Sequence, residues 1–499
     1  MENLRSRLSF GKKADDVKLR KRKSRLYSKE DESLENGVLR ARVFVFSVVF
    51  RLVNCLLVRT SFVPDEYWQS LEVSHRMVFN YGYLTWEWKA GIRGFVYPLF
   101  YACLYKILLM LNHDSVHLLI WLPRVAQALL AAFADTKFFF LIRSLENHNM
   151  AKWTFFCHMV SWFSWFCCTR TLTNSTETIL TCLALCYFPL PGSKTHSSKK
   201  YLALEERKLR LVTHNYIPIG TFALVISALI DCMFYKKWTL VQFNFLKLNI
   251  FHGVADFYGS HPWHWYFSQG FAVVIGPHLP FFLHGCILAF RKYKILLAAV
   301  VWTIGVYSFL PHKEFRFIYP VLPFCMLFCG ASLTHLKAHR RSAAAFLLVA
   351  NLIPALYTGL IHQRGTLDVM IHLQKLCDVK GNSTHPQPDV LFLMPCHSTP
   401  FYSHIHCPLK MRFLECPPDL GEEGYFDEAD RFYEDPLLWL RTSFPYKSSL
   451  PTHLVLFNVL EKEISAFLQR NEFVKTAELF HTHFPEGKVG GSIFIYERH

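Results

Sequence analysis

Long apolar stretches separated by short polar or basic segments constrain the fold of this chain more than any other feature. In a bilayer, each stretch can form a helix that satisfies its own backbone hydrogen bonds. Only 18% of the 499 residues are charged and 52% are hydrophobic, which excludes a disordered chain and argues against a soluble enzyme. The predicted spans are Val43–Val58, Phe95–Leu111, Val116–Ile142, Ala151–Cys168, Thr178–Leu190, Tyr216–Phe234, Phe267–Phe290, Ile295–Leu310, Phe317–Leu333 and Ala343–Ile361. The sequence therefore predicts a mostly α, multi-pass membrane bundle.

The amino end of the chain is basic. A cluster between Lys18 and Arg25 precedes the first span, and such clusters mark the cytoplasmic side of a membrane. Residues 1–42 are therefore expected to be cytoplasmic and the first span to be an uncleaved anchor, because the polar stretch is too long for a signal peptide. The cluster and the net charge of +16 would also fit nucleic-acid binding, but the spans that follow favour a membrane protein without a nucleic-acid partner.

The composition changes after Ile361. Residues 362–499 contain no apolar run of span length, and Asp389–Met394 and Ser492–Tyr496 alternate as strands do. We therefore expect a transmembrane bundle over residues 43–361 and a small soluble α+β domain over residues 362–499.

Four cysteines in this C-terminal segment would allow two disulfides in an oxidising compartment, with simple packing as the alternative. They are Cys377, Cys396, Cys407 and Cys416, and the sequence leaves all three pairings open. The nearby His397, His404 and His406 raise the alternative of a zinc site, but the spacing fits no standard site and we expect no metal. Asn382 begins an Asn-Ser-Thr sequon and is a predicted glycosylation site.

Basic loops predict the orientation of the spans. Arg291–Lys294 and Lys337–Arg341 should be cytoplasmic, which puts the loop around His312 and the tail on the opposite, lumenal side. A cytoplasmic amino end and a lumenal tail require an odd number of crossings, whereas ten spans are predicted. The polar stretch Gly192–Asn215 is where a span could be missing.

Two adjacent carboxylates, Asp65 and Glu66, follow the first span in the loop Arg59–Gly94. Pro64 can occupy the first helical position, so both acids fall in the first turn of a helix over Tyr67–Val78. One interpretation is an amphipathic helix lying on the bilayer. The other is a carboxylate that takes a proton from a sugar hydroxyl, with Asp65 as the catalytic base and Glu66 orienting the substrate or the loop.

Two more clusters on the same side carry groups suited to a sugar phosphate. The loop at 312–316 offers cations for a donor phosphate, although such charges also sit among headgroups. These residues are His312, Lys313 and Arg316. Aromatic and imidazole groups could contact sugars or form an interfacial belt. The predicted substrate contacts are Trp86, Glu87, His261, Trp263 and His264.

The motifs of several other enzyme classes are missing from the sequence. It contains no Gly-rich nucleotide loop, no metal-ligand spacing and no Gly-x-Ser-x-Gly. A membrane enzyme of this kind would use a lipid-borne donor, and we expect no cofactor. The competing class is a transporter or lipid scaffold, which would place ionisable groups mid-bilayer within repeated, broken helices. No internal repeat is found and the densest polar motifs lie in loops, which favours an enzyme.

These motifs resemble the glycosylphosphatidylinositol (GPI) mannosyltransferases of glycosyltransferase family 22. The matching motifs are Phe62-Val-Pro-Asp-Glu-Tyr-Trp-Gln-Ser-Leu-Glu-Val, Tyr81-Gly-Tyr-Leu-Thr-Trp-Glu-Trp, Phe257-Tyr-Gly-Ser-His-Pro-Trp-His-Trp-Tyr, His312-Lys-Glu-Phe-Arg-Phe-Ile-Tyr-Pro, Met394-Pro-Cys-His-Ser-Thr-Pro and Cys416-Pro-Pro-Asp-Leu. The resemblance covers the chain from about Val43 to Glu497. It implies a GT-C fold in the endoplasmic reticulum membrane and places the catalytic base in the pair Asp65–Glu66. The implied reaction is inverting transfer of the third mannose, by an α-1,2 link, from dolichyl-phosphate-mannose to the GPI-anchor precursor.

The chain departs from this family in two places. Family members carry an extra apolar segment, with an Arg-Pro-Thr motif, where Leu204 here runs directly into Glu205. Restoring that segment would give eleven crossings, an odd number that agrees with a cytoplasmic amino end and a lumenal tail. The stretch Phe234–Trp238 also has Lys where the family more often has Gly. We therefore expect a shortened form with activity below that of a full-length relative, or an inactive or regulatory form, in which Thr178–Leu190 becomes re-entrant or interfacial.

Overall fold

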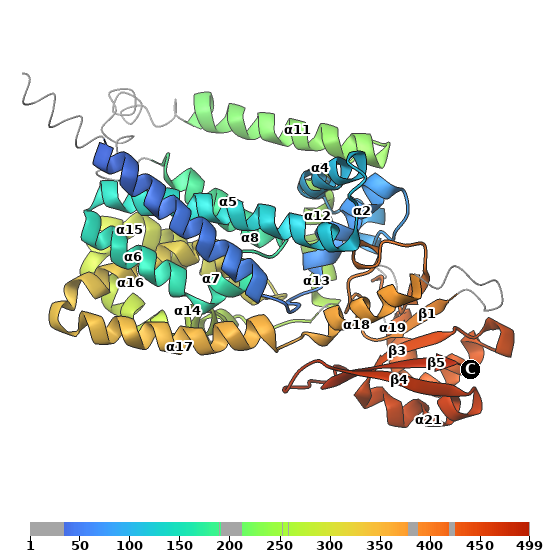
Figure 1. Cartoon of the computed structure of the whole chain (residues 1–499). Helices are drawn as coiled ribbons and strands as arrows, with labels where there is room; N and C mark the ends of the chain where they lie inside the picture. Colours follow the sequence, from blue (N-terminus) through green and yellow to red (C-terminus); the bar gives the residue numbers. More distant parts are fainter. Residues whose placement is uncertain are drawn as a thin grey trace, which may run out of the picture.

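The computed structural model describes residues 34–188, 190, 212–251, 253–257, 259–377, 388–418 and 425–498. A helical bundle forms most of the molecule, and a small sheet with its own helices lies at one end (Figure 1). Asn382 and the junction of Leu204 and Glu205 lie outside the described residues.

The bundle consists of apolar helices in the order predicted. They are residues 34–57, α4 (Val96–Met110), α5 (Val116–Leu145), α6 (His148–Val160), α7 (Trp162–Cys167), α8 (Thr173–Leu185), α11 (Ile217–Tyr235), α12 (Val241–Leu246), α14 (Phe271–Ile275), α15 (Leu279–Phe309), α16 (Leu322–His335) and α17 (Arg340–Leu360). By length and composition, five helical stretches of the described chain can cross a membrane, namely Val116–Leu145, Val212–Tyr235, Tyr266–Phe309, Phe315–His335 and Lys337–Cys377. The chain is a mostly α, multi-pass membrane protein, as predicted.

Two predicted spans meet within one helical stretch, and a third is short. Phe267–Phe290 ends and Ile295–Leu310 begins within α15, whose two helical parts meet at Tyr293 (φ −112°, ψ 28°), so the break lies in the basic stretch where the sequence predicted it. The predicted span Thr178–Leu190 corresponds to α8, whose 13 residues are fewer than the roughly 20 that a crossing needs.

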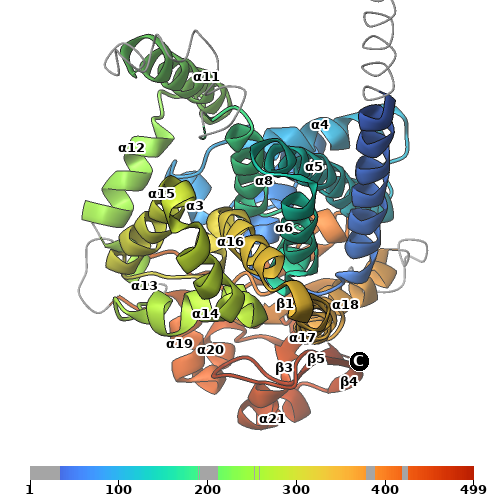
Figure 2. The same cartoon turned by 90° about the vertical axis from the view of Figure 1, so that its left-hand side faces the viewer.

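Helix α11 lies apart from the other helices. Asp231 is its only buried residue, and both views show the helix at the edge of the molecule (Figures 1 and 2). It is attached at Phe95, whose backbone N–H donates a hydrogen bond of 2.7 Å to Asp231 Oδ1 and whose ring contacts those of Phe234 and Tyr235 at 4.9 Å. The helix ends at Lys236, which has a φ of 55°.

Inside the bundle, a buried ion triad joins three helices. Arg51 Nε lies 2.6 Å from one carboxylate oxygen of Asp135, and His158 Nε2 lies 2.8 Å from the other. All three side chains are at most 5% exposed. Buried charges need such pairing, since an isolated one costs several kcal/mol.

The C-terminal domain contains a five-stranded sheet of order β2-β1-β3-β5-β4. The strands are β1 (Asp389–Leu393), β2 (Lys410–Phe413), β3 (His453–Phe457), β4 (Phe473–Phe480) and β5 (Ser492–Arg498). β1 is parallel to β2 and β3, whereas β5 is antiparallel to β3 and β4. Strands β1 and β5 confirm the two predicted from alternation.

The two faces of this sheet have different partners, because successive strand residues point to opposite sides. Leu391, Leu454 and Phe494 pack against α19 (Glu428–Glu434), α20 (Pro436–Ser443) and α21 (Glu461–Arg470). Val390, Phe392 and Val455 belong to the same core as Tyr67 and Trp68, which directly follow Asp65 and Glu66. The sheet is therefore packed onto the first loop of the bundle.

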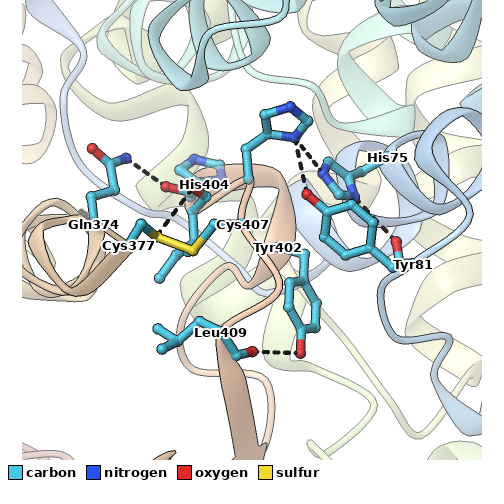
Figure 3. Close-up of a disulfide and its surroundings, with 10 residues drawn as sticks. His75, Tyr81, Gln374, Cys377, Tyr402, His404, Cys407 and Leu409 are labelled. Carbon is cyan, nitrogen blue, oxygen red and sulfur yellow. Dashed lines mark hydrogen bonds between the residues drawn. A yellow bond between two sulfur atoms is a disulfide. The ribbon is translucent and has the colours of Figure 1, made fainter. Parts of the chain in front are cut away.

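Two disulfides cross-link residues 377–416, a segment that contains β1 and β2 and packs against this loop; Figure 3 shows one of them near His75 and Tyr81. Cys377 pairs with Cys407 and Cys396 with Cys416, which selects one of the three pairings left open by the sequence. Because the sulfurs of Cys396 and Cys416 are bonded to each other, they and the neighbouring His397 form no zinc site in this structure.

Candidate active site

The chain turns from the first loop into a buried helix directly after Asp65 and Glu66. The backbone N–H groups of Tyr67 and Trp68 donate to the carbonyl oxygen of Pro64 at 3.0 and 3.1 Å. A π-helical turn, η1 (Tyr67–Leu71), leads into α2 (Glu72–Phe79). Every residue from 67 to 75 is buried. The interpretation of this segment as an amphipathic helix lying on the bilayer is therefore wrong, because it packs between the bundle and the C-terminal domain.

The two adjacent carboxylates have different surroundings. Glu66 is 4% exposed and lies 2.8 Å from Arg170 Nη1. Arg170 also donates to the carbonyl oxygens of Thr60 at 2.5 Å and Phe166 at 2.7 Å. Asp65 is 26% exposed and lies 2.6 Å from Arg316 Nη2. Glu66 is thus part of a closed network, whereas Asp65 is open to a substrate.

Arg316 joins the first loop to the loop that precedes α16. It donates to Glu314 at 2.5 and 2.7 Å in addition to Asp65. His312 Nε2 lies 3.2 Å from Glu314, and this hydrogen bond raises the pKa of His312. Burial raises the pKa of Glu314, but the charges and hydrogen bonds of Arg316 and His312 outweigh this effect and lower the pKa to about 2. Asp65, Glu314, Arg316 and His312 therefore form one charged cluster.

Lys313 faces away from this cluster. Its ammonium donates to the carbonyl oxygens of His261 at 2.8 Å, of Pro311 at 3.5 Å and of Leu310. The residue is 3% exposed, and burial lowers its pKa. Lys313 holds the segment around His261 to its own loop, and its contact with a donor phosphate stays a prediction.

A second carboxylate lies near Asp65. Glu87, in the short helix α3 (Trp86–Lys89), accepts hydrogen bonds of 2.5 and 2.9 Å from Arg93. Burial raises the pKa of Glu87, the charge of Asp65 adds to this effect and Arg93 opposes it. Trp86 begins the same helix and is half-buried.

The remaining predicted substrate contacts lie together on the segment before η4 (Tyr266–Gly270). The ring of His261 stacks on Trp265 at 4.7 Å, and Trp265 packs against Phe315 at 4.9 Å. Trp263 is 68% exposed and His264 is also exposed. Their role in binding stays a prediction.

A cavity of about 820 Å³ opens beside this charged region. Polar groups from Gln69, Arg93 and Glu177 line it together with apolar groups from α4, α5 and α8. The full lining is Gln69, Trp88, Ile92, Arg93, Gly94, Val96, Tyr97, Phe100, Gln127, Leu130, Thr173, Thr176, Glu177, Leu180, Thr181 and Ala184. No sequence pattern predicted this cavity or the role of Arg170, because distant segments of the chain build them. The role of Arg93 was not predicted either, although its partner Glu87 is only six residues away.

The fold is similar to that of a protein whose crystal structure contains bound undecaprenyl phosphate. The crystal structure of ArnT from Cupriavidus metallidurans bound to undecaprenyl phosphate matches with a TM-score of 0.51 and covers 91% of this chain and 97% of that chain. The sequence identity is 12%, so the match concerns the fold alone. The fold is of the GT-C type, as predicted.

The sequence is similar to proteins named GPI alpha-1,2-mannosyltransferase 3. The protein from Danio rerio is 60% identical, with 100% of this chain and 98% of that protein covered, and the one from Homo sapiens is 56% identical, with 97% and 92% covered. The Danio rerio alignment spans 526 residues, which is 27 more than the 499 of this chain, so this chain has gaps against its relative. The model of the Alg9-like mannosyltransferase family matches residues 42–206 and 201–406. The chain is a glycosyltransferase and belongs to the Alg9-like mannosyltransferase family.

Proposed function

We propose that this enzyme adds the third mannose of the GPI-anchor precursor by an α-1,2 link, with dolichyl-phosphate-mannose as the donor. One observation carries the proposal. The carboxylate of Asp65 and the guanidinium of Arg316, 251 residues apart in sequence, lie 2.6 Å from each other. A base for the acceptor hydroxyl and a cation for the donor phosphate thus belong to the same site.

The reaction needs one proton transfer and one displacement. Asp65 accepts the proton of the acceptor 2-hydroxyl as its oxygen attacks C1 of the donor mannose. The bond between C1 and the phosphate oxygen breaks, and dolichyl phosphate leaves from the opposite face, which inverts the configuration. Arg316 and His312 stabilise the negative charge that develops on the leaving phosphate. The proposal requires no metal and no cofactor, because the donor brings its own leaving group.

The cavity beside Arg93 suits the lipid part of a substrate. Its wall combines polar groups near Glu87 with apolar side chains such as Phe100, Leu130 and Leu180. A lipid phosphate combines a charged head with an apolar chain, which is the distribution of groups that this lining offers.

We further propose that the enzyme resides in the endoplasmic reticulum membrane with a cytoplasmic amino end and a lumenal C-terminal domain. The basic loops support this orientation through the positive-inside preference. The disulfides support it as well, since they form in oxidising compartments.

The test measures mannose transfer in microsomes in which this chain is the only enzyme that could add the third mannose. With labelled dolichyl-phosphate-mannose and a precursor bearing two mannoses, a product with one additional α-1,2-linked mannose is expected. A full-length relative is the positive control. No product from this chain, at normal expression and with an active control, would identify it as an inactive or regulatory form.

A further inference from the structure

The C-terminal domain extends to the first loop of the bundle. The indole N–H of Trp68 donates to the carbonyl oxygen of Thr399 at 3.0 Å. The hydroxyl of Tyr83 donates to Glu415 at 2.6 Å. Both partners belong to the segment that the disulfide between Cys396 and Cys416 cross-links. Side chains of the C-terminal domain are therefore available at the edge of the candidate active site.

This disulfide holds His397 and Glu415 near each other, because each is the sequence neighbour of a bonded cysteine. His397 has a φ of 61°, in the left-handed region that few side chains adopt. Its ring packs against Trp68 at 4.8 Å and against Phe413 at 5.2 Å. The imidazole is thus held in one orientation next to the helix that follows Asp65.

The imidazole of His397 is neutral near pH 7. Burial lowers its pKa to about 4, although the charges of Asp65 and Glu415 oppose this effect. Within the described residues, no hydrogen bond engages the ring. A neutral imidazole offers one donor and one acceptor, and the carboxylate of Glu415 offers further acceptor positions.

We infer that His397 and Glu415 bind the hydroxyl groups of the acceptor glycan next to Asp65. Sugar hydroxyls both donate and accept hydrogen bonds, which matches a neutral imidazole beside a carboxylate. A donor phosphate would instead need cations, and Arg316, which contacts Asp65, supplies one. Tyr83 positions Glu415 through its hydroxyl. This inference rests on the proposed function, since it names the part of the enzyme that recognises the acceptor.

The sharpest variant is H397F, because it keeps the ring packing on Trp68 and removes both nitrogens. The Michaelis constants for the acceptor and the donor are measured separately. We expect the acceptor KM to rise about tenfold, as for the loss of one or two hydrogen bonds, with the donor KM unchanged. H397N should recover part of the loss, because Asn tolerates the left-handed backbone and restores a donor and an acceptor. E415Q is measured in the same way as H397F. Its matched control is E472Q, which makes the same change at the exposed Glu472.

A binding measurement makes the inference independent of turnover. Saturation-transfer NMR with mannobiose and the purified full chain should show contacts to the sugar that are reduced in H397F. An unchanged acceptor KM together with unchanged sugar signals in H397F would overturn the inference. Mannose transfer by the wild type would still support the proposed function in that case. Sugar contacts that depend on His397 without any transfer by the wild type would contradict the proposed function alone.

Discussion

At the residue scale, the neighbouring side chains of Asp65 and Glu66 have different roles, the first in catalysis and the second in stability. We expect Asp65→Asn to lower kcat by about 10²–10⁴-fold, the usual contribution of a general base, without loss of folded protein. Initial rates of mannose transfer, together with the thermal unfolding midpoint in detergent, check this. Full turnover by the Asn variant would place the base elsewhere.

Glu66→Gln should act on stability instead. It removes the charge opposite the buried guanidinium of Arg170, and breaking a buried pair costs about 3–5 kcal/mol. A lower unfolding midpoint, with residual activity in the fraction that stays folded, is the expected result. A variant that unfolds like the wild type but is inactive would mean that Glu66 and Asp65 have exchanged roles.

Arg316 and Lys313 provide a second contrast. Arg316→Gln removes the cation beside Asp65, so we expect the KM for dolichyl-phosphate-mannose to rise at least about tenfold, with little change in the acceptor KM. Lys313→Gln leaves three backbone carbonyls without their donor, so its effect should be on stability. Saturation curves for both substrates, measured for each variant, separate the two outcomes. A donor KM that stays constant in Arg316→Gln would remove the phosphate assignment.

Much of the charged cluster could be predicted from the sequence, because Asp65, Glu87, His312 and Arg316 lie in polar motifs between apolar stretches. The role of Arg170 could not be predicted. It follows the predicted span Ala151–Cys168, whereas its partner Glu66 is 104 residues away, and only the packing of helices brings the two side chains together.

At the scale of elements, helix α2 is tied to the C-terminal domain by Glu72. Its carboxylate accepts hydrogen bonds from the backbone N–H groups of Phe401 at 2.8 Å and Ser403 at 3.2 Å, and from the Ser403 hydroxyl at 2.5 Å. Burial raises the pKa of Glu72 to about 7, and these hydrogen bonds only partly offset it. Tyr81 and Tyr402, which also face this carboxylate, stay neutral in the same range.

The sign of the resulting pH dependence follows from the raised pKa. The folded protein holds the proton of Glu72 more tightly than the unfolded chain, so this contribution to stability is complete below about pH 4.5 and is lost as the pH rises through about 7. We expect the unfolding midpoint of the wild type to fall over this window more steeply than that of Glu72→Gln. Parallel curves for the two proteins would contradict the prediction.

The spans were predictable because each apolar stretch is long, but their connections were not. The basic stretch Arg291–Lys294 predicted a break between two spans, and the structure has this break as a kink at Tyr293 rather than as a long loop. Strand β4 was missed because five of its eight positions are exposed, including Val474 and Lys475, and an edge strand lacks the alternation of a half-buried one.

At the scale of the whole molecule, the gaps against the relatives lead to a prediction about activity. The two stretches matched by the family model meet at residues 201–206, and the alignment with the Xenopus laevis relative spans 532 residues. Inserting the additional segment of a relative between Leu204 and Glu205 should raise mannose transfer several-fold over the chain as it stands. The comparison uses matched expression in cells that lack the enzyme. Equal activity would mean that the shorter chain compensates for the segment.

The side of the membrane on which the C-terminal domain lies is tested by its sequon. We expect Asn382 to carry an endoglycosidase-sensitive glycan, because the basic loops and the disulfides favour a lumenal domain. Asn382→Gln is the control for the mobility shift on gels. An unglycosylated chain at normal expression would argue that the carboxyl half is inverted.

The triad of Arg51, Asp135 and His158 has a consequence for how the chain is made. Arg51 leaves the ribosome 84 residues before Asp135, which at roughly 5–20 residues per second is a delay of about 4–17 s. An arginine in the middle of a helix opposes insertion by about 2.5–3.5 kcal/mol until it finds its counter-charge. The first helix is therefore poorly suited to the lipid on its own, and we expect its stable insertion to depend on α5, which carries Asp135. The order of synthesis is in this sense part of the information that assembles the bundle.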